Sequence, residues 1–475
     1  MAHMACDYEM IAGLETHAEL STETKIFCSC STAFGGEPNT HCCPVCMGMP
    51  GVLPSLNRRV VEFAVLAGLA TNCKVNLYSR MDRKNYCYPD LPKAYQITQF
   101  DFPICENGWI QLQNGRKIRI RRIHIEEDAG KLLREGNTIH IDYNRCGVPL
   151  IEIVTEPDIR SPEEAREYVE ELQKTLRYLG ISDCRMQEGS LRCDVNLSMR
   201  RKGESALGQR TEIKNMNSLS NMVKAMEYEA ERQKSLLEKG IPVRRETLRF
   251  EVSSGRTEPM RGKEELDDYR YFPEPDVPPI LLTEYEVETL RESLPELPGE
   301  KYRRYTEEMG IPEADARLLS KYRSVAEYFE EASRDCKSAK NAANWILGPI
   351  FARIPTEAEK ENFSPPVPAE QLRELLLLHE KGSVSTNMAK RILEKMLDTG
   401  RPCSECISRE ELLPLSADAL QKACREAIEN LPQAAEDYKK GKTKALKALL
   451  GAVMRSTKGR APAGEAEALL QKLLQ

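Results

Sequence analysis

Residues 122–131 read RIHIEEDAGK, an alternating apolar run followed by three consecutive acids and a Gly-Lys turn. Isoleucines at positions 118, 120 and 125 predict a strand with one buried face. Three adjacent carboxylates repel one another unless a cation lies among them, and such hard oxygen ligands suit Mg²⁺ or Ca²⁺. For this stretch alone, a solvated acidic turn is the alternative interpretation.

Length and composition indicate a multidomain globular protein. The chain has 475 residues, enough for two to four domains, with 41% hydrophobic and 30% charged residues. No apolar stretch is long enough to span a membrane and no secretory leader is visible, so we expect a cytoplasmic protein without an anchor. Because the net charge is −6, a nucleic-acid surface has to be local.

Sixteen scattered cysteines favour reduced thiols and a metal site over a disulfide framework. Two close pairs flank a loop rich in glycine and proline. These four are Cys28, Cys30, Cys43 and Cys46. Four thiolates fill the tetrahedron of Zn²⁺ and leave no open position, so the spacing predicts a structural zinc site. The neighbours His41 and Cys42 could replace one ligand, and reduced core cysteines are the alternative.

Polar side chains recur on one face of several predicted strands. In the opening strand, alternation places Glu15, His17 and Glu19 together. The strands near 188–198 and 210–215 repeat the pattern. Their polar members are Arg192, Asp194, Asn196, Arg210, Glu212 and Lys214. One such face would be a solvent-facing strand, whereas recurring faces of both signs predict a concave charged sheet for a polyanion and its metal.

Cations in two further segments are candidates for phosphate contacts. The loop 82–93 is rich in proline and aromatic residues and offers Arg83, Lys84 and Lys93. Between Tyr438 and Arg460 there are eight basic residues and no acid, which suits an RNA backbone as well as a solvated helix face. No complete phosphate loop and no nucleophile motif is present, so the charged sheet would have to hold any ATP.

Taken in chain order, these motifs resemble the B subunit of the aspartyl/glutamyl-tRNA(Asn/Gln) amidotransferases. The likeness covers nearly the whole chain and rests on residues 13–17, the two cysteine pairs, and residues 82–93, 124–131, 188–196, 210–215 and 268–279. It implies an α+β fold: a glutamine-synthetase-like cradle with an antiparallel sheet, an all-α helical domain and a small α-helical tail. The implied domains are 5–292, with a zinc-binding insert at 28–46, then 293–405 and 410–475.

The resemblance also implies a reaction. ATP would phosphorylate the side-chain carboxylate of misacylated Glu-tRNA(Gln) or Asp-tRNA(Asn), because oxide is too poor a leaving group for direct amidation. Ammonia tunnelled from a partner amidase (glutaminase), the A subunit, would then displace the phosphate, and a small C subunit would complete a heterotrimer. Since phosphoryl transfer depends mainly on positioning and charge neutralisation, a metal cluster without a nucleophile fits this chemistry.

The family pattern assigns residues to these roles. Magnesium would be held by Glu15, His17, Glu126, Glu127 and Asp194. Our candidates for nucleotide and phosphate contacts are Arg192, Arg210 and Lys84, with Lys214 beside the reacting groups. The candidates for tRNA contacts are Lys439, Lys440, Lys442, Lys444, Arg455 and Lys458.

The sequence departs from the family pattern at Thr16, Ala18 and Glu19, where valine, valine and glutamine are usual, so an extra acid is expected beside the metal site. Two other functions compete with the amidotransferase. One is a zinc-stabilised tRNA-binding scaffold, although clustered acids would repel its phosphates. The other is a carboxylate–amine ligase acting without a partner.

Overall fold

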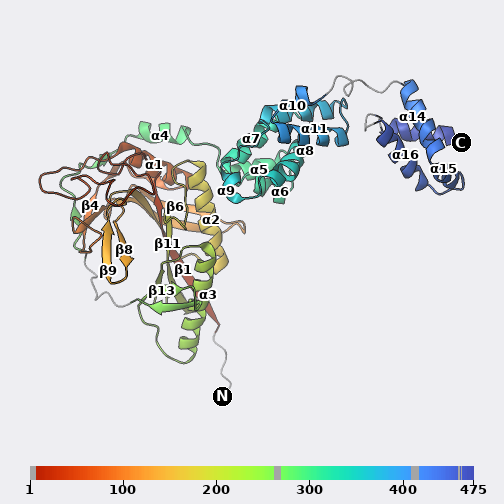
Figure 1. Ribbon diagram of the computed structural model, residues 1–475. Helices are drawn as coiled ribbons and strands as arrows, with labels where there is room; N and C mark the ends of the chain where they lie inside the picture. Colours follow the sequence, from red (N-terminus) through yellow and green to blue (C-terminus); the bar gives the residue numbers. More distant parts are fainter. Residues whose placement is uncertain (1–6, 261–268, 408–416, 458–460, 462, 475) are drawn as a thin grey trace, which may run out of the picture. The chain divides into compact units, whose positions relative to one another are not determined.

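The computed structural model describes residues 7–260, 269–407, 417–457, 461 and 463–474. It divides into two compact units, Met1–Leu297 and Pro298–Gln475. The first unit mixes strands and helices, and the second has helices but no strand among its described residues, so the chain has the expected mixture of a large sheet and many helices (Figure 1). Within the described ranges, no helix is both long and apolar enough to cross a membrane.

A nine-stranded sheet forms the body of the first unit, in the order β14-β13-β12-β11-β1-β10-β7-β6-β2. Its strands are β1 (Tyr8–Glu19), β2 (Lys74–Val75), β6 (Cys105–Gln111), β7 (Lys117–Glu127), β10 (Pro149–Thr155), β11 (Leu191–Arg201), β12 (Thr211–Lys214), β13 (Thr247–Glu251) and β14 (Arg256–Pro259). The sheet is antiparallel, as expected, except that β12 and β13 pair in parallel. The helix α3 (Leu219–Glu238) crosses between these two strands, and a parallel pair needs such a crossover.

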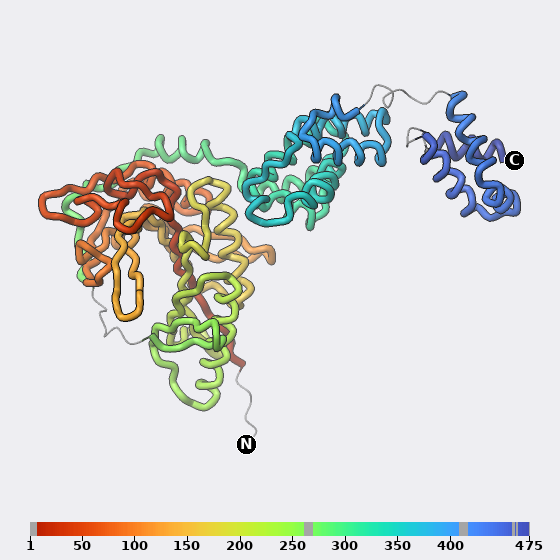
Figure 2. The backbone as a smooth tube through the Cα atoms, viewed as in Figure 1, coloured from red at the N-terminus to blue at the C-terminus, as the bar shows by residue number. Residues whose placement is uncertain are grey.

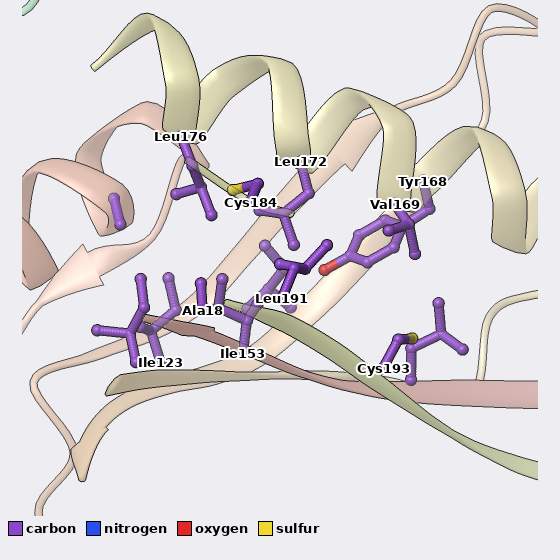
Figure 3. Packing of buried hydrophobic residues seen from close by; sticks show 14 of the residues in the cluster. Ala18, Ile123, Ile153, Tyr168, Val169, Leu172, Leu176, Cys184, Leu191 and Cys193 are labelled. Carbon is purple, nitrogen blue, oxygen red and sulfur yellow. The ribbon is translucent and has the colours of Figure 1, made fainter. Parts of the chain in front are cut away.

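One face of the sheet is covered by helices. The helix α2 (Pro162–Tyr178) begins as its sequence predicts, with Ser161 accepting a hydrogen bond from the Glu164 N–H and proline at the first position. Figure 3 shows its apolar side against the strands (Figure 3). The facing residues include Tyr168, Val169, Leu172 and Leu176 of the helix and Ala18, Ile123, Ile153 and Leu191 of the sheet. Because the helices cover one face of the sheet, the alternate residues of the same strands point to the opposite face.

A β-bulge interrupts β7. The ladder with β10 skips Arg121, so that the alternation of inward and outward residues shifts by one position. The isoleucines on both sides of the bulge therefore reach the core. They are Ile118, Ile120, Ile123 and Ile125, none more than 1% exposed. The same shift decides which of the following acids faces away from the helices.

Smaller ribbons and two further helices complete the first unit. The ribbons are β3 (Tyr78–Ser79) with β16 (Ile280–Leu281), β4 (Asp82–Asn85) with β5 (Tyr95–Thr98) and β15 (Phe272–Pro273), and β8 (Lys131–Glu135) with β9 (Thr138–Asp142). The helices are α1 (Arg58–Ala70) and α4 (Glu284–Glu292). The cysteine-rich insert folds against the end of β9, where the Asn39 side chain donates to the Ile141 carbonyl at 2.9 Å (Figure 2).

The second unit contains two separate hydrophobic clusters. The first runs from Tyr305 to Ile407 and the second from Leu420 to Leu474. The helices of the first are α5 (Pro298–Glu307), α6 (Glu313–Leu319), α7 (Arg323–Ser333), α8 (Ala339–Trp345), η1 (Ile346–Ile350), η2 (Phe351–Arg353), α9 (Glu357–Glu361), α10 (Ala369–Glu380), α11 (Thr386–Thr399) and α12 (Cys403–Cys406). Those of the second are α14 (Ala417–Asn430), α15 (Pro432–Lys439), α16 (Ala445–Ser456) and α17 (Ala463–Leu474).

Candidate functional site

The sheet face opposite the helices carries ionisable side chains from five neighbouring strands. In the ladders, Glu15 lies opposite Asp194, and His17 lies between Arg192 and Glu152. Residues directly opposite each other in a sheet share a face, so these side chains converge. The convergence follows from the period of two that the sequence already shows in β1 and β11.

Two groups of three potential metal ligands stand on this face, and within each group the donor atoms lie within 4.8 Å of one another. The first group is His17, Glu126 and Glu152, and the second is Glu15, Asp194 and Glu212. In the first group, the His17 Nε2 lies 3.4 Å from a carboxylate oxygen of each glutamate. Glu15 and His17 are two positions apart in β1, so the Cα atoms of these two members are roughly 7 Å apart.

Positive side chains balance these acids. Burial alone would lower the pKa of His17, but the carboxylates of Glu152 and Glu126 raise it to about 9. Burial also works against the charge on Glu152, yet His124 and His17 hold its pKa well below the usual range. In the second group, Lys214 Nζ lies 2.9 Å from Asp194 and 2.8 Å from Glu212. The chain's own cations thus occupy places that suit a divalent ion.

Glu127 lies in neither group. Adjacent residues of a strand point to opposite faces, so Glu126 and Glu127 cannot both reach the acid face. The Glu127 carboxylate instead accepts hydrogen bonds from Lys93 and from the Ile97 N–H, the latter at 2.8 Å. The single five-ligand cluster expected from the sequence is therefore divided: Glu126 and His17 belong to one group, and Glu15 and Asp194 to the other.

Sequence reasoning missed two members of the groups. Glu152 is the only acid of the apolar strand β10, and it lies opposite both His17 and His124. A lone acid in such a strand is the signal that could have found it. Glu212 was recognised as part of a polar face but not as a ligand, although its neighbour Asn196 lies beside Glu15 in the sheet.

The predicted phosphate contacts have different surroundings. Arg192 Nη2 donates to Asp128 at 2.6 Å, while its buried Nε has no partner among the described residues. Lys84 Nζ lies 4.9 Å from the Tyr269 ring centroid; burial opposes its charge, but Glu126 and Glu152 raise its pKa. Both cations therefore border the first group. Arg210 is exposed just before β12 and stays a prediction.

The extra acid at Glu19 lies beside Asp128. Burial, with the adjacent Asp128 carboxylate, raises the pKa of Glu19 to about 8. Arg192 and Arg145 hold the pKa of Asp128 below its usual range although burial works against this. Burial and the adjacent acid thus favour the protonated form of Glu19, whereas the two arginines favour the ionised form of Asp128.

The four predicted cysteines form a third group, with sulfur atoms within 4.8 Å of one another and all thiols free. A tetrahedron with Zn–S bonds of ~2.3 Å has edges of roughly 3.8 Å, which that spacing accommodates. The Cys43 N–H also donates to the Cys46 sulfur at 3.1 Å. The residues fit Zn²⁺. His41 and Cys42 are not members of the group.

Comparisons with known proteins place this geometry in a family. Residues 10–288 match the model of the GatB/GatE catalytic domain, and residues 327–474 match that of the GatB domain. The chain belongs to the GatB family. The resemblance drawn from the motifs is confirmed, and with it the enzyme class: one component of a glutamine-hydrolysing, tRNA-dependent amidotransferase.

Curated relatives agree over almost the whole chain. Three of them, each named as the B subunit of aspartyl/glutamyl-tRNA(Asn/Gln) amidotransferase, come from Caldicellulosiruptor saccharolyticus, Thermoanaerobacter pseudethanolicus and Moorella thermoacetica. The first is 51% identical over 465 residues and the second 50% over 459, each covering 96% of both chains. The third is 47% identical over 476 residues, which is 98% of this chain and 100% of the relative.

The basic segment lies within the part matched by the GatB domain. Two of its lysines are paired with acids just before the segment, Lys440 with Glu436 and Lys442 with Asp437, both at 3.1 Å. Three other predicted contacts are exposed and form no ion pair with any described residue. We refer to them as the tail cations: Lys439, Lys444 and Arg455. Lys458 lies outside the described residues.

Proposed function

We propose that the first unit uses ATP to activate the side-chain carboxylate of Glu-tRNA(Gln) or Asp-tRNA(Asn) and then amidates it. The carboxylate oxygen attacks the γ-phosphorus of ATP, the bond to ADP breaks, and an acyl phosphate forms. Ammonia then attacks the acyl carbon, and phosphate leaves with its oxygen. The names of the relatives support the substrate class. The paired three-ligand groups on one sheet face are the observation that carries the proposal.

The acid face provides the charge control that this transfer needs. Mg²⁺ held by His17, Glu126 and Glu152, and by Glu15, Asp194 and Glu212, would neutralise the triphosphate. Histidine is an uncommon ligand for Mg²⁺, so the carboxylates would supply most of the affinity. Lys214, released from two carboxylates by an arriving cation, would then be free to contact a phosphate. Arg192 and Lys84 would hold the nucleotide at the edge of the first group.

The remaining roles extend the proposal to partners and domains. The sequence carries no nucleophile motif for glutamine hydrolysis, so we assign that step to a partner amidase, the A subunit, with a small C subunit completing a cytoplasmic heterotrimer. The first unit would be the glutamine-synthetase-like cradle, stabilised by zinc at the four cysteines. The helical tail of the second unit would bind the tRNA backbone through its tail cations.

The decisive experiment separates catalysis from scaffolding. In the complex reconstituted with the amidase and the small partner, Asp194→Asn and Glu152→Gln should each lower ATP-dependent transamidation by more than about 10²-fold, while tRNA binding persists. The exposed Glu135→Gln is the matched control and should retain full activity. Formation of labelled acyl phosphate without ammonia isolates the first step. Full turnover in both site variants would favour the scaffold and refute the proposal.

A further inference from the structure

Lys25 is a fully buried lysine beside the cysteine group. Its side chain is 0% exposed. The Nζ donates to the His41 carbonyl at 2.7 Å and to the Tyr143 carbonyl at 3.4 Å, and it lies 3.9 Å from the Cys46 sulfur. All the hydrogen-bond acceptors that the structure gives this ammonium are thus two neutral carbonyls and one sulfur.

A buried ammonium requires a counter-charge. Moving such an ion out of water costs several kcal/mol even after relaxation, and neutral carbonyls compensate only part of this. Among the described residues, Lys25 forms no ion pair with a carboxylate. Glu127 lines the same 210 Å³ cavity, but its carboxylate is bonded to Lys93 and to the Ile97 N–H. The remaining source of negative charge is Cys46 and the three cysteines grouped with it.

We propose that Lys25 is the counter-cation of a zinc–tetrathiolate cluster and raises its affinity for the metal. The inference rests on the proposed zinc at the four cysteines. Zn²⁺ with four thiolates carries a net charge of −2, and part of that charge would lie at the Cys46 sulfur, the one buried member of the group, where it is costly. A single ammonium at the Cys46 sulfur offsets half of it. The mutual need of the two charges also explains why a lysine, rather than an apolar residue, fills this position.

The backbone holds Lys25 ready for this role. Its N–H donates to the Cys30 carbonyl at 3.0 Å, and the next N–H, of Ile26, donates to the Gly147 carbonyl at 3.0 Å. Lys25 is therefore fixed between one ligand of the cluster and the turn at 143–147 before any metal binds. Outer partners fixed in this way usually contribute 10- to 100-fold to metal affinity. Lys25 is thus a positioning residue rather than a ligand.

The test measures zinc affinity in the full chain by competition with a chromophoric chelator. Lys25→Gln keeps a donor without the charge, and Lys25→Met removes both. We expect each to bind zinc about 10- to 100-fold more weakly than the unchanged protein, with Lys25→Arg retaining more. The matched control is Lys301→Met, which removes a buried lysine paired with Glu330 at 2.5 Å in the second unit. Its zinc affinity should not change.

The outcomes separate the inference from its premise. If the unchanged protein binds no zinc, the proposed zinc site fails, and the role of Lys25 fails with it. If it binds zinc and Lys25→Gln binds equally tightly, only the role of Lys25 is refuted. Neutral variants that fold only at raised zinc concentration support the proposal, because that concentration reports the same affinity. Neutral variants that stay unfolded at every zinc concentration overturn it.

Discussion

Glu229 offers a direct test of how the acid-bearing strands are held in place. This carboxylate on α3 is 0% exposed and accepts hydrogen bonds from Thr211 and Thr257, at 2.9 and 3.0 Å, and from Gln233 at 2.8 Å. Arg232 adds two more, each at 2.8 Å. One side chain thereby ties α3 to β12, which carries Glu212 and Lys214, and to β14.

The cost of Glu229→Ala follows from those contacts. Arg232 is partly exposed and regains water, and Thr211 and Gln233 keep their mutual bond at 2.9 Å. The Thr257 hydroxyl, however, loses the acceptor that it has in the structure, and a cavity forms. Removing one partner of a buried ionic network typically costs about 3–5 kcal/mol, so we expect the free energy of unfolding of the first unit to fall by that amount.

The two tryptophans make this measurable. Trp109 lies in the first unit and Trp345 in the second, so in a Trp345→Phe background the fluorescence change in urea reports the first unit alone. The control is Glu231→Ala, an exposed acid on the same helix, which should change the unfolding free energy by less than about 0.5 kcal/mol. A loss below about 1 kcal/mol for Glu229→Ala would refute the account of the network.

Three other perturbations have clear expected results. Glu152→Gln should weaken Mn²⁺ binding by at least about 10-fold, because one of the three ligands loses its charge. Binding is measured by the paramagnetic effect of Mn²⁺ on water relaxation. Unchanged binding would remove Glu152 from the site. Glu274→Ala removes the two bonds of 2.6 and 2.8 Å from Arg83 and leaves it, among the described residues, only the half-exposed Asp276 at 3.1 Å, so it should cost about 1–3 kcal/mol in urea unfolding, with the exposed Glu284→Ala as control. Replacing all three tail cations by alanine should weaken tRNA binding. It should also reduce the slope of the logarithm of the binding constant against the logarithm of salt concentration by up to about three. A slope equal to that of the unchanged protein would place the tRNA elsewhere.

Local patterns in the sequence predicted which of several side chains lie together. Alternation in β1 and β11 was enough to bring Glu15, His17 and Asp194 to one face, and the cysteine spacing predicted the third group. These placements could be predicted because strand geometry and short loops act over a few residues. The start of α2 was predictable for the same reason, since its cap and first turn lie in a few consecutive residues.

Longer-range features were not accessible in this way. Glu152 lies next to His17 because β10 pairs with β1, and the choice of neighbouring strands is a property of the topology. The parallel pairing of β12 and β13 depends on where the long helix α3 returns the chain. In the tail, counting charge from Tyr438 onward omitted Glu436 and Asp437, which the helical turn brings back to Lys440 and Lys442.

The extra residue at Arg121 determines which face of the sheet each later residue of β7 points to. With it, Glu126 is turned toward the acid face, and Glu127 toward Lys93. Removing that residue would keep every acid in the chain but exchange the two: Glu127 would face the acid groups in place of Glu126, and the isoleucines after the bulge would leave the core. Two chains with the same acidic residues would therefore differ in whether those residues come together, because of one inserted or deleted residue in the strand.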